Sequence, residues 1–231
     1  MGPIIALLGA ESTGKTTLAL TLARQLRTLG REATVVDEYL REFCDAAGRT
    51  PHRGEQASIA AEQARRIEAA AQSGSIVLAD TTPLMTAVYS DFVFGDPSLY
   101  ASALAWQRRC GCTLLMGIDL AWQADGLQRD GPQVRAPIDA MVRGALDSAG
   151  LPYAVVYGSG EARTAAALAA LRPLLGLPIA AGATAGTPGG AAPAADETMP
   201  RWLSRCRECL VPGCEHLRRL LPSPPRHHDR S

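Results

Sequence analysis

Residues 9–16 read Gly9-Ala10-Glu11-Ser12-Thr13-Gly14-Lys15-Thr16, and Thr17 follows directly. This stretch fits the pattern G-x-x-x-x-G-K-[ST], in which backbone N–H groups turn inward toward a polyphosphate. An apolar run at residues 4–8 precedes it and predicts a buried parallel strand. Apolar residues at helical spacing follow it and predict a helix that ends at Gly30: Leu18, Leu22, Leu26 and Leu29. The order of strand, glycine loop and helix is the one that an anion-binding loop requires.

The residue types of this loop predict how it would bind Mg²⁺ and ATP. We expect Lys15 to reach the β- and γ-phosphates and the Thr16 hydroxyl to ligate Mg²⁺. The other predicted nucleotide contacts come from the rest of the loop: Gly9, Glu11, Ser12, Thr13, Gly14 and Thr17. Lys15 is the only lysine in the chain, so its place in the motif argues against a chance match in a glycine-rich loop. The position needs a compact ammonium group rather than the planar fork of arginine.

Composition limits the class of protein. A chain of 231 residues can form one α/β domain with a full core and a small appendage. Its formal net charge is zero, so no global field favours nucleic acid or an anionic membrane. The short apolar run after Met1 lacks a basic flank, and we therefore expect no signal peptide and a cytoplasmic protein. In that compartment the six cysteines would be free thiols or metal ligands rather than disulfides.

Two further apolar runs end in acidic residues. Residues 33–36 predict a strand that ends at Asp37-Glu38, and residues 75–80 predict one that ends at Asp80. Functional groups of parallel sheets gather beyond the carboxyl ends of the strands. We therefore expect Asp80 to hold Mg²⁺, directly or through water, or to orient the nucleophile. The alternative is that Asp80 caps the next helix.

The acidic pair after the second predicted strand allows two interpretations. Asp37 or Glu38 would act as a base for a substrate hydroxyl, or as a hydrogen-bond acceptor for a sugar. Alternatively, the pair is the ordinary acidic N-terminus of a helix over residues 39–47. Position alone does not separate these interpretations.

The remaining pattern predicts the fold class. Helices are expected over residues 54–72, 98–109 and 161–171, with a further one from near Ile138 and an aromatic-rich one within 81–96. Apolar runs at 113–119 and 152–158 predict the fourth and fifth strands. Strands that alternate with helices predict an α/β fold of the P-loop kinase type. Its parallel sheet has about five strands, flanked by helices.

A polar, glycine-bearing segment lies between the fourth strand and the helix near Ile138. Its arginines, Arg129 and Arg135, suit a lid that closes on ATP and neutralises charge on the transferring phosphoryl group. The alternative is a solvated loop with ordinary surface arginines.

Four stretches also resemble the NadR-type ribosylnicotinamide kinases, over roughly residues 4–172. The phosphate loop with its Glu-Ser pair is one, and Asp37-Glu38-Tyr39-Leu40-Arg41-Glu42 is similar to that family's acidic-aromatic-arginine stretch. Asp80-Thr81-Thr82 with Thr86-Ala87-Val88-Tyr89-Ser90 resembles its Asp-Thr segment. Asp119-Leu120-Ala121-Trp122 through Asp125-Gly126-Leu127-Gln128-Arg129 resembles its lid.

This resemblance implies transfer of the ATP γ-phosphate to the 5′-hydroxyl of nicotinamide riboside, which yields nicotinamide mononucleotide. By position, Asp37 or Glu38 would meet the ribose or its hydroxyl, with Tyr39 and Asp125 beside the substrate. Trp122 would stack on the cationic pyridinium ring, and Arg129 would close over the phosphates.

The chain also departs from the family pattern. Ala121 replaces the usual proline of the lid, and Thr82 stands where the closest members carry a second acid. The histidines do not form the His-x-Gly-His signature of the adenylyltransferase domain found in longer family members. Strand one begins at once, so no N-terminal helix-turn-helix is expected. We therefore expect the kinase part only, over residues 1–172.

The C-terminal residues have a different composition. Residues 173–198 are nearly all Ala, Gly, Pro and Thr and predict a flexible linker. Residues 199–220 contain a Cys₃His set that suits structural zinc: Cys206, Cys209, Cys214 and His216. Such a short segment would gain its fold from the metal. The alternative is a short helix with incidental thiols, and residues 221–231 predict a disordered tail.

Three functional hypotheses follow from the sequence. The first is a Mg²⁺- and ATP-dependent kinase for nicotinamide riboside. The second is a P-loop kinase for another nucleoside or small metabolite. The third is a regulatory ATP-binding protein whose zinc segment recruits a protein or nucleic-acid partner.

Overall fold

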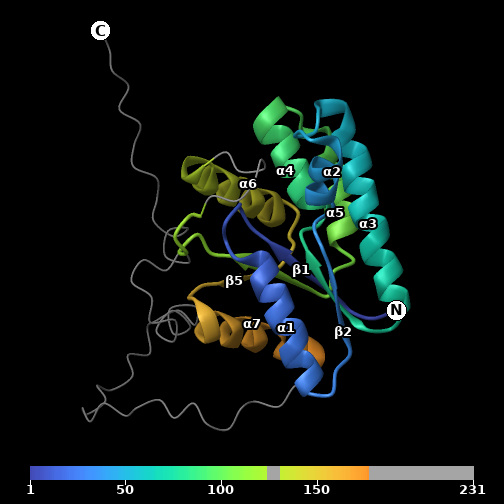
Figure 1. The fold of residues 1–231 in the computed structure, drawn as a ribbon, viewed down its shortest axis with the longest axis vertical. Coiled ribbons are helices and arrows are strands. Elements are labelled where there is room, and N and C mark those ends of the chain that lie inside the picture. Colours follow the sequence, from blue (N-terminus) through green and yellow to red (C-terminus); the bar gives the residue numbers. More distant parts are fainter. Residues whose placement is uncertain (124–130, 177–231) are drawn as a thin grey trace, which may run out of the picture. The chain divides into compact units, whose positions relative to one another are not determined.

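The computed structural model of the chain describes residues 1–123 and 131–176. In this part the sheet has five strands: β1 (Ile4–Leu8), β2 (Ala33–Val36), β3 (Ile76–Asp80), β4 (Cys112–Met116) and β5 (Ala154–Val156). They lie in the order β2-β3-β1-β4-β5, and every neighbouring pair is parallel (Figure 1). The prediction of a parallel sheet with about five strands is confirmed. Parallel neighbours need crossover connections, and here helices supply them.

The register places the ends of the two central strands together. Leu7 of β1 pairs with Asp80 of β3 on one side and with Leu114 of β4 on the other. The loop that leaves β1 and the acid that ends β3 therefore emerge at the same edge of the sheet. Next to β3, the β2 ladder reaches Val36 opposite Ala79. Residues that follow all three strands consequently gather at one edge.

Helices cover both faces of the sheet (Figure 1). One face packs against α1 (Lys15–Thr28) and α7 (Gly160–Leu175). The other packs against four helices: α3 (Gln56–Gln72), α4 (Pro83–Phe94), α5 (Tyr100–Gln107) and α6 (Arg135–Ser148). The short helix α2 (Tyr39–Ala47) packs on α3. Single 3₁₀ turns precede α3, α5 and α6, at Arg53–Glu55, Pro97–Leu99 and Pro132–Val134.

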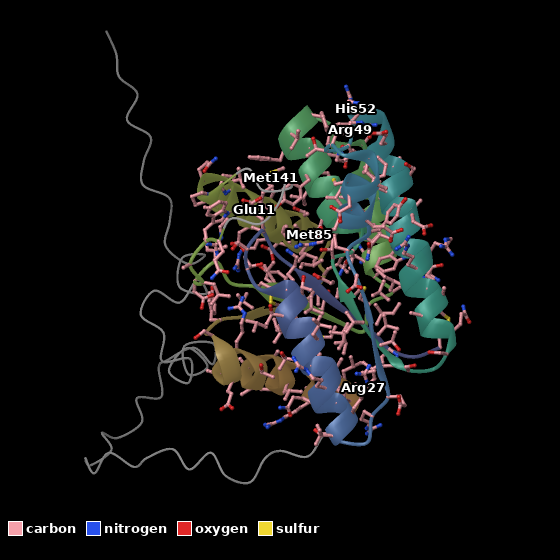
Figure 2. All side chains as sticks on the ribbon, viewed as in Figure 1. Glu11, Arg27, Arg49, His52, Met85 and Met141 are labelled. Carbon is pink, nitrogen blue, oxygen red and sulfur yellow. The ribbon has the colours of Figure 1, made fainter. Side chains whose placement is uncertain are left out.

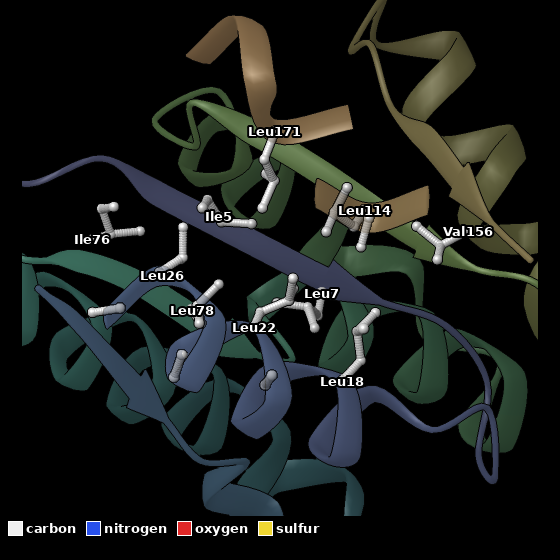
Figure 3. Close-up of a cluster of buried hydrophobic side chains, with 14 of the residues drawn as sticks. Ile5, Leu7, Leu18, Leu22, Leu26, Ile76, Leu78, Leu114, Val156 and Leu171 are labelled. Carbon is white, nitrogen blue, oxygen red and sulfur yellow. The ribbon is translucent and has the colours of Figure 1, made fainter. Parts of the chain in front are cut away.

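Alternation along β1 divides the core between the two faces. Ile5 and Leu7 contact the α1 and α7 side, whereas Ala6 and Leu8 contact the α4 and α6 side. Figure 3 shows the first cluster, in which Leu18, Leu22 and Leu26 of α1 lie against the strands. Burying each such side chain contributes about 1.5–3 kcal/mol. The helix after the phosphate loop is thus held by the sheet along its buried face.

Two details of the predicted helices are wrong. The first helix stops at Gly30 as predicted, since Leu29 is its C-cap and Gly30 follows with φ 72°. Leu29, however, does not belong to the buried face of α1, because it is 53% exposed. The closing helix does not end at Leu171. It continues to Leu175 with Pro173 inside its last turns, and Gly176 caps it with φ 59°. Leu175 is buried one turn beyond Leu171 in the same cluster, and this packing outweighs the helix-breaking tendency of proline.

Several predictions lie outside the described residues. These are the remainder of the predicted linker, the Cys₃His segment with its four proposed zinc ligands, the tail at 221–231, and the lid residues Asp125 and Arg129. Within residues 1–123 and 131–176, no helix combines the length and apolar character that a membrane crossing needs.

Candidate nucleotide-binding site

The loop between β1 and α1 has the backbone that phosphate binding needs. Gly9, Ser12 and Gly14 have positive φ angles of 145°, 55° and 77°. A Cβ atom at Gly9 would lie 2.9 Å from Met116 Cβ, so only glycine fits beside β4. The left-handed conformation of Ser12 costs about 1–2 kcal/mol for an L-residue. Left-handed residues among right-handed ones turn successive N–H groups toward a common point, which forms an anion-binding concavity.

The Lys15 side chain lies over this loop. Its Nζ donates to the carbonyl oxygens of Gly9 at 2.9 Å and Ala10 at 3.1 Å. The Thr13 hydroxyl donates to Ala10 O at 2.7 Å, which fixes the same turn from within. Lys15 is 9% exposed, so solvent screens its charge at the loop only weakly. This is the position from which an ammonium group can meet a polyphosphate.

Thr16 and Asp80 meet at the edge of the sheet. The Thr16 hydroxyl donates to Asp80 Oδ2, and Asp80 is 1% exposed. Its second oxygen, Oδ1, has no hydrogen-bond partner among the described residues. Burial raises the pKa of the Asp80 carboxyl, whereas the charge of Lys15 acts in the opposite direction. A hydroxyl beside a buried carboxylate with a free oxygen is a donor set that Mg²⁺ accepts.

The next helix is capped by a different residue. Thr82 is the N-cap of α4, where its Oγ1 accepts from Leu84 N at 3.3 Å. The same hydroxyl donates to Gln107 Oε1 at 2.7 Å, and Thr82 is fully buried. The alternative interpretation of Asp80 as the helix cap is therefore wrong. Thr82, which stands where the resembling family carries an acid, has a structural role.

The two acids after β2, Asp37 and Glu38, lie in different environments. The Asp37 side chain is exposed. The Glu38 side chain is 15% exposed and pairs with Arg41 Nε at 3.1 Å. Glu38 lies close enough to Asp80 for its negative charge to raise the pKa of the Asp80 carboxyl further. It stands at the N-cap position of α2, but its side chain makes no capping hydrogen bond there. The geometry therefore favours an electrostatic role at the sheet edge for Glu38 over simple helix capping.

A cavity of about 950 Å³ runs along the loop. Lys15, Thr16 and Thr17 line it from the loop and α1. The other lining residues come from α2, from the segment after β4 and from the start of α7, and they include Arg41, Leu120, Gln123, Glu161 and Arg163. Its volume lies within the range of small-molecule pockets, and its walls meet the same edge that carries Asp80.

Glu11 holds the segment that faces the loop. Glu11 is 8% exposed, and its Oε1 accepts from Trp122 Nε1 at 3.0 Å and from Gly131 N at 3.0 Å. The neighbouring Ser12 hydroxyl accepts from Gln123 N at 2.8 Å. The loop thus binds both flanks of the predicted lid. The sequence marks the Glu-Ser pair by resemblance, but its partners are more than a hundred residues away and leave no local signal.

Two predicted substrate contacts do not belong to the lining of this cavity. The Tyr39 ring stacks under the Arg66 guanidinium of α3, 4.4 Å from the ring centre. Trp122 is half-buried and is held by Glu11. Neither ring is among the side chains that line the cavity. Lys15, Thr16 and Arg41 are therefore brought together, whereas Tyr39 faces a different helix.

Two buried arginines support the site, and sequence reasoning missed the role of both. Arg163 is 4% exposed, and its Nη2 donates to Thr13 O at 2.8 Å. Its Nη1 donates to Gly158 O at 2.8 Å and to Asp119 Oδ1 at 3.2 Å. The predicted lid arginine Arg135 is 7% exposed, is the first residue of α6 and donates to Leu120 O at 2.8 Å. Both side chains therefore fasten backbone around the loop.

Comparison with known proteins places this fold. The AAA domain family matches residues 4–163, which is more than half of the chain. No curated protein matches the sequence. Among solved structures, the chain is similar to a NadR protein in complex with NR, with a TM-score of 0.61 and 20% identity over 77% of this chain. It spans 52% of that protein, about half its length.

A second solved structure is shikimate kinase from Acinetobacter baumannii in complex with shikimate. It has a TM-score of 0.45 and 17% identity, and the match covers 76% of this chain and 94% of that one. The resemblance to NadR-type kinases is thus confirmed for the fold. The protein is a member of the AAA domain family and carries a P-loop fold like that of a NadR protein.

Proposed function

We propose that this protein transfers the γ-phosphate of ATP to the 5′-hydroxyl of a nucleoside, with Mg²⁺, and that the nucleoside is nicotinamide riboside. The observation that carries the chemistry is the meeting of Lys15, Thr16 and Asp80 at one edge of the sheet. The choice of nucleoside is supported by the four stretches that resemble NadR-type kinases and by the fold shared with a NadR protein in complex with NR.

The phosphate side of the reaction uses the loop and its neighbours. Backbone N–H groups of the loop and the Lys15 ammonium would bind the β- and γ-phosphates, with Gly9, Ser12, Thr13, Gly14 and Thr17 as the remaining contacts. Thr16 and Asp80 would hold Mg²⁺, which would offset the negative charge of the phosphates when bound. The protein's own contribution is positioning and charge neutralisation rather than covalent chemistry.

The acceptor side would use the acids after β2. Glu38 would accept the proton of the attacking hydroxyl, because it is held by Arg41 close to Asp80. Asp37, which is exposed one residue earlier, would accept a hydrogen bond from a ribose hydroxyl. Arg41, which pairs with Glu38, also lines the cavity, as Lys15 does.

The contacts with the nicotinamide ring of the substrate are proposed from the resemblance. Trp122 would stack on the pyridinium ring, an attraction between an aromatic face and a cation. Its indole N–H is engaged by Glu11, which leaves the ring face as the contact surface. Asp125 and Arg129 would complete the lid. The proposed substrate contact of Tyr39 rests on resemblance alone, since its ring stacks with Arg66.

The test is ADP release with Mg²⁺-ATP across a panel of nucleosides that includes nicotinamide riboside, with mass spectrometry of the product. Saturable turnover confined to nicotinamide riboside is the expected result. Turnover with another nucleoside would keep the kinase reaction and overturn the choice of acceptor. Slow ATP hydrolysis that no acceptor accelerates would overturn the kinase proposal in favour of a regulatory nucleotide-binding protein.

We further propose that residues 199–220 bind one structural zinc ion through Cys206, Cys209, Cys214 and His216, and that this segment contacts a protein partner. Four soft ligands within eleven residues support this proposal. Metal analysis of the purified protein should find zinc, and Cys209→Ser should release it without a change in turnover. Purified protein that contains no zinc would contradict the proposal.

A further inference from the structure

Gln63 of α3 is a buried amide that the proposed mechanism does not use. It is 2% exposed and lies among the apolar residues of the inner face of α3. A buried amide is costly unless its donors and acceptors are paired. Its pairing therefore shows which groups this side chain holds.

The Gln63 amide bonds to three backbone atoms just beyond the ends of two strands. Its Oε1 accepts from Tyr39 N at 2.7 Å. Its Nε2 donates to Asp37 O at 3.3 Å and to Thr81 O at 3.3 Å. A backbone N–H can pair only with the amide oxygen, and two carbonyl groups can pair only with the amide NH₂, so the partners themselves assign the orientation.

These bonds join β2 and β3 beyond the last pair of their ladder. The ladder reaches Val36 opposite Ala79, and the chains then separate into Asp37-Glu38 and Asp80-Thr81. Thr81 has φ 79°, a costly conformation for a β-branched residue that persists only where its surroundings hold it. The Gln63 amide holds the Thr81 carbonyl in this conformation and ties it to the backbone on both sides of Glu38.

We propose that Gln63 is a positioning residue, which holds Glu38 at its working distance from Asp80 by joining the backbone that carries each of them. This inference rests on the proposed function, because those two carboxylates serve the acceptor and Mg²⁺ there. Catalysis by positioning is sensitive to displacements of about 1 Å, which cost about a hundredfold in rate. Gln63 does not line the cavity, and in this proposal it acts only through the backbone of Asp37, Tyr39 and Thr81.

The test compares two substitutions of matched buried glutamines. Gln63→Met keeps the length of the side chain and removes all three bonds. Gln107→Met is the control, because Gln107 is also 2% exposed and bonds to the Thr82 and Thr113 hydroxyls rather than to the backbone beside the acids. We expect Gln63→Met to lower kcat about ten- to a hundredfold with KM for ATP within about twofold, and Gln107→Met to leave both unchanged. Equal losses in the two variants would overturn the proposal.

A second readout does not depend on turnover. Hydrogen–deuterium exchange of the Tyr39 amide should accelerate at least about tenfold in Gln63→Met and not in Gln107→Met, because only the first loses its acceptor. Unchanged exchange at Tyr39 would overturn the inference even if the kinase is active. Accelerated exchange in a protein that phosphorylates no nucleoside would support the positioning and overturn the proposed function instead. If Gln63→Met does not fold, Gln63→Asn takes its place, since it keeps the amide but is too short to reach both strands.

Discussion

The phosphate loop holds itself together over short distances in sequence, whereas the walls that face it are attached over very long ones. Thr13 and Lys15 bond to carbonyl groups three to six residues away. Trp122, Gly131 and Arg163 reach the loop from residues 111, 120 and 150 positions distant. The same few loop residues, Glu11 to Thr13, accept all three of these distant bonds. A single short loop therefore carries both the phosphate-binding backbone and the attachment points of its surroundings.

The local bonds and the distant bonds therefore have different roles: the first serve phosphate binding, and the second hold the loop against its surroundings. The local bonds place the groups that would meet phosphate, so their loss should remove activity and leave the fold unchanged. The distant bonds join α7 and the segment between β4 and α6 to the loop, so their loss should cost stability or preorganisation first. Each of the following experiments tests that division.

Lys15→Ala should have the largest effect. It removes the ammonium that lies over the loop, and we expect kcat/KM to fall by about 10³-fold or more with an unchanged circular dichroism spectrum. Lys15→Arg should also be nearly inactive, because a planar guanidinium does not replace a compact ammonium here. Activity in Lys15→Ala close to that of the unsubstituted protein would refute the assignment of the phosphate loop.

Arg163→Met should act on stability. It leaves the carbonyl groups of Thr13 and Gly158 without their buried donor, and we expect the free energy of unfolding in urea to fall by about 3 kcal/mol. Arg172→Met is the control in the same helix, where the side chain is only half-buried, and it should change stability by less than about 0.5 kcal/mol. Similar losses in the two variants would show that Arg163 is not a specific attachment of the loop.

Glu11→Leu should have an intermediate effect on activity. It removes the acceptor shared by Trp122 and Gly131, and we expect kcat/KM to fall about tenfold because the facing segment is less well held. Glu11→Gln keeps an oxygen acceptor at the same position and should retain most of the activity. If Gln and Leu behave alike, the charge of Glu11 matters rather than its hydrogen bonds, and the attachment role is wrong.

Acid should have the smallest effect, and it should act away from the site. Hydrogen bonds from Arg49 and from the His52 backbone lower the pKa of Glu55 to about 2, and Arg65 and Arg66 lower that of Glu62 to about 2. A lowered folded-state pKa gives stability that is present above the ordinary value of 4.5 and is lost as the pH falls toward 2. Figure 2 shows Arg49 and His52 close together at one end of the molecule.

The measurement is the thermal midpoint between pH 5 and pH 2 for the parent protein and for Glu55→Gln. The variant should show a shallower fall, and the two midpoints should converge near pH 2. High salt should reduce the difference, because these ion pairs are exposed and contribute little each. A steeper fall in the variant would contradict the sign of the shift.

The sequence alone determined the parts that depend on local pattern. The five strands, the phosphate loop and the acid at the end of β3 were all predicted, because period and motif spacing are local properties of the chain. The helix after the phosphate loop stops at Gly30 as predicted, but Leu29 of its apolar pattern is exposed. The last helix continues through Pro173 to Leu175, because packing of Leu175 on the sheet outweighs the tendency of proline to end a helix.

The tertiary structure alone decided which distant side chains meet the loop and the strand ends. Nothing in the residues around Glu11, Gln63 or Arg163 indicates that these side chains have partners 18 to 150 residues away. Buried amides, carboxylates and guanidinium groups bond to whichever backbone the packing brings near them, and a single sequence carries no periodic signal for that. The motif therefore predicts which residues would bind phosphate. The packing of the helices on the sheet decides which distant residues hold the phosphate loop in place.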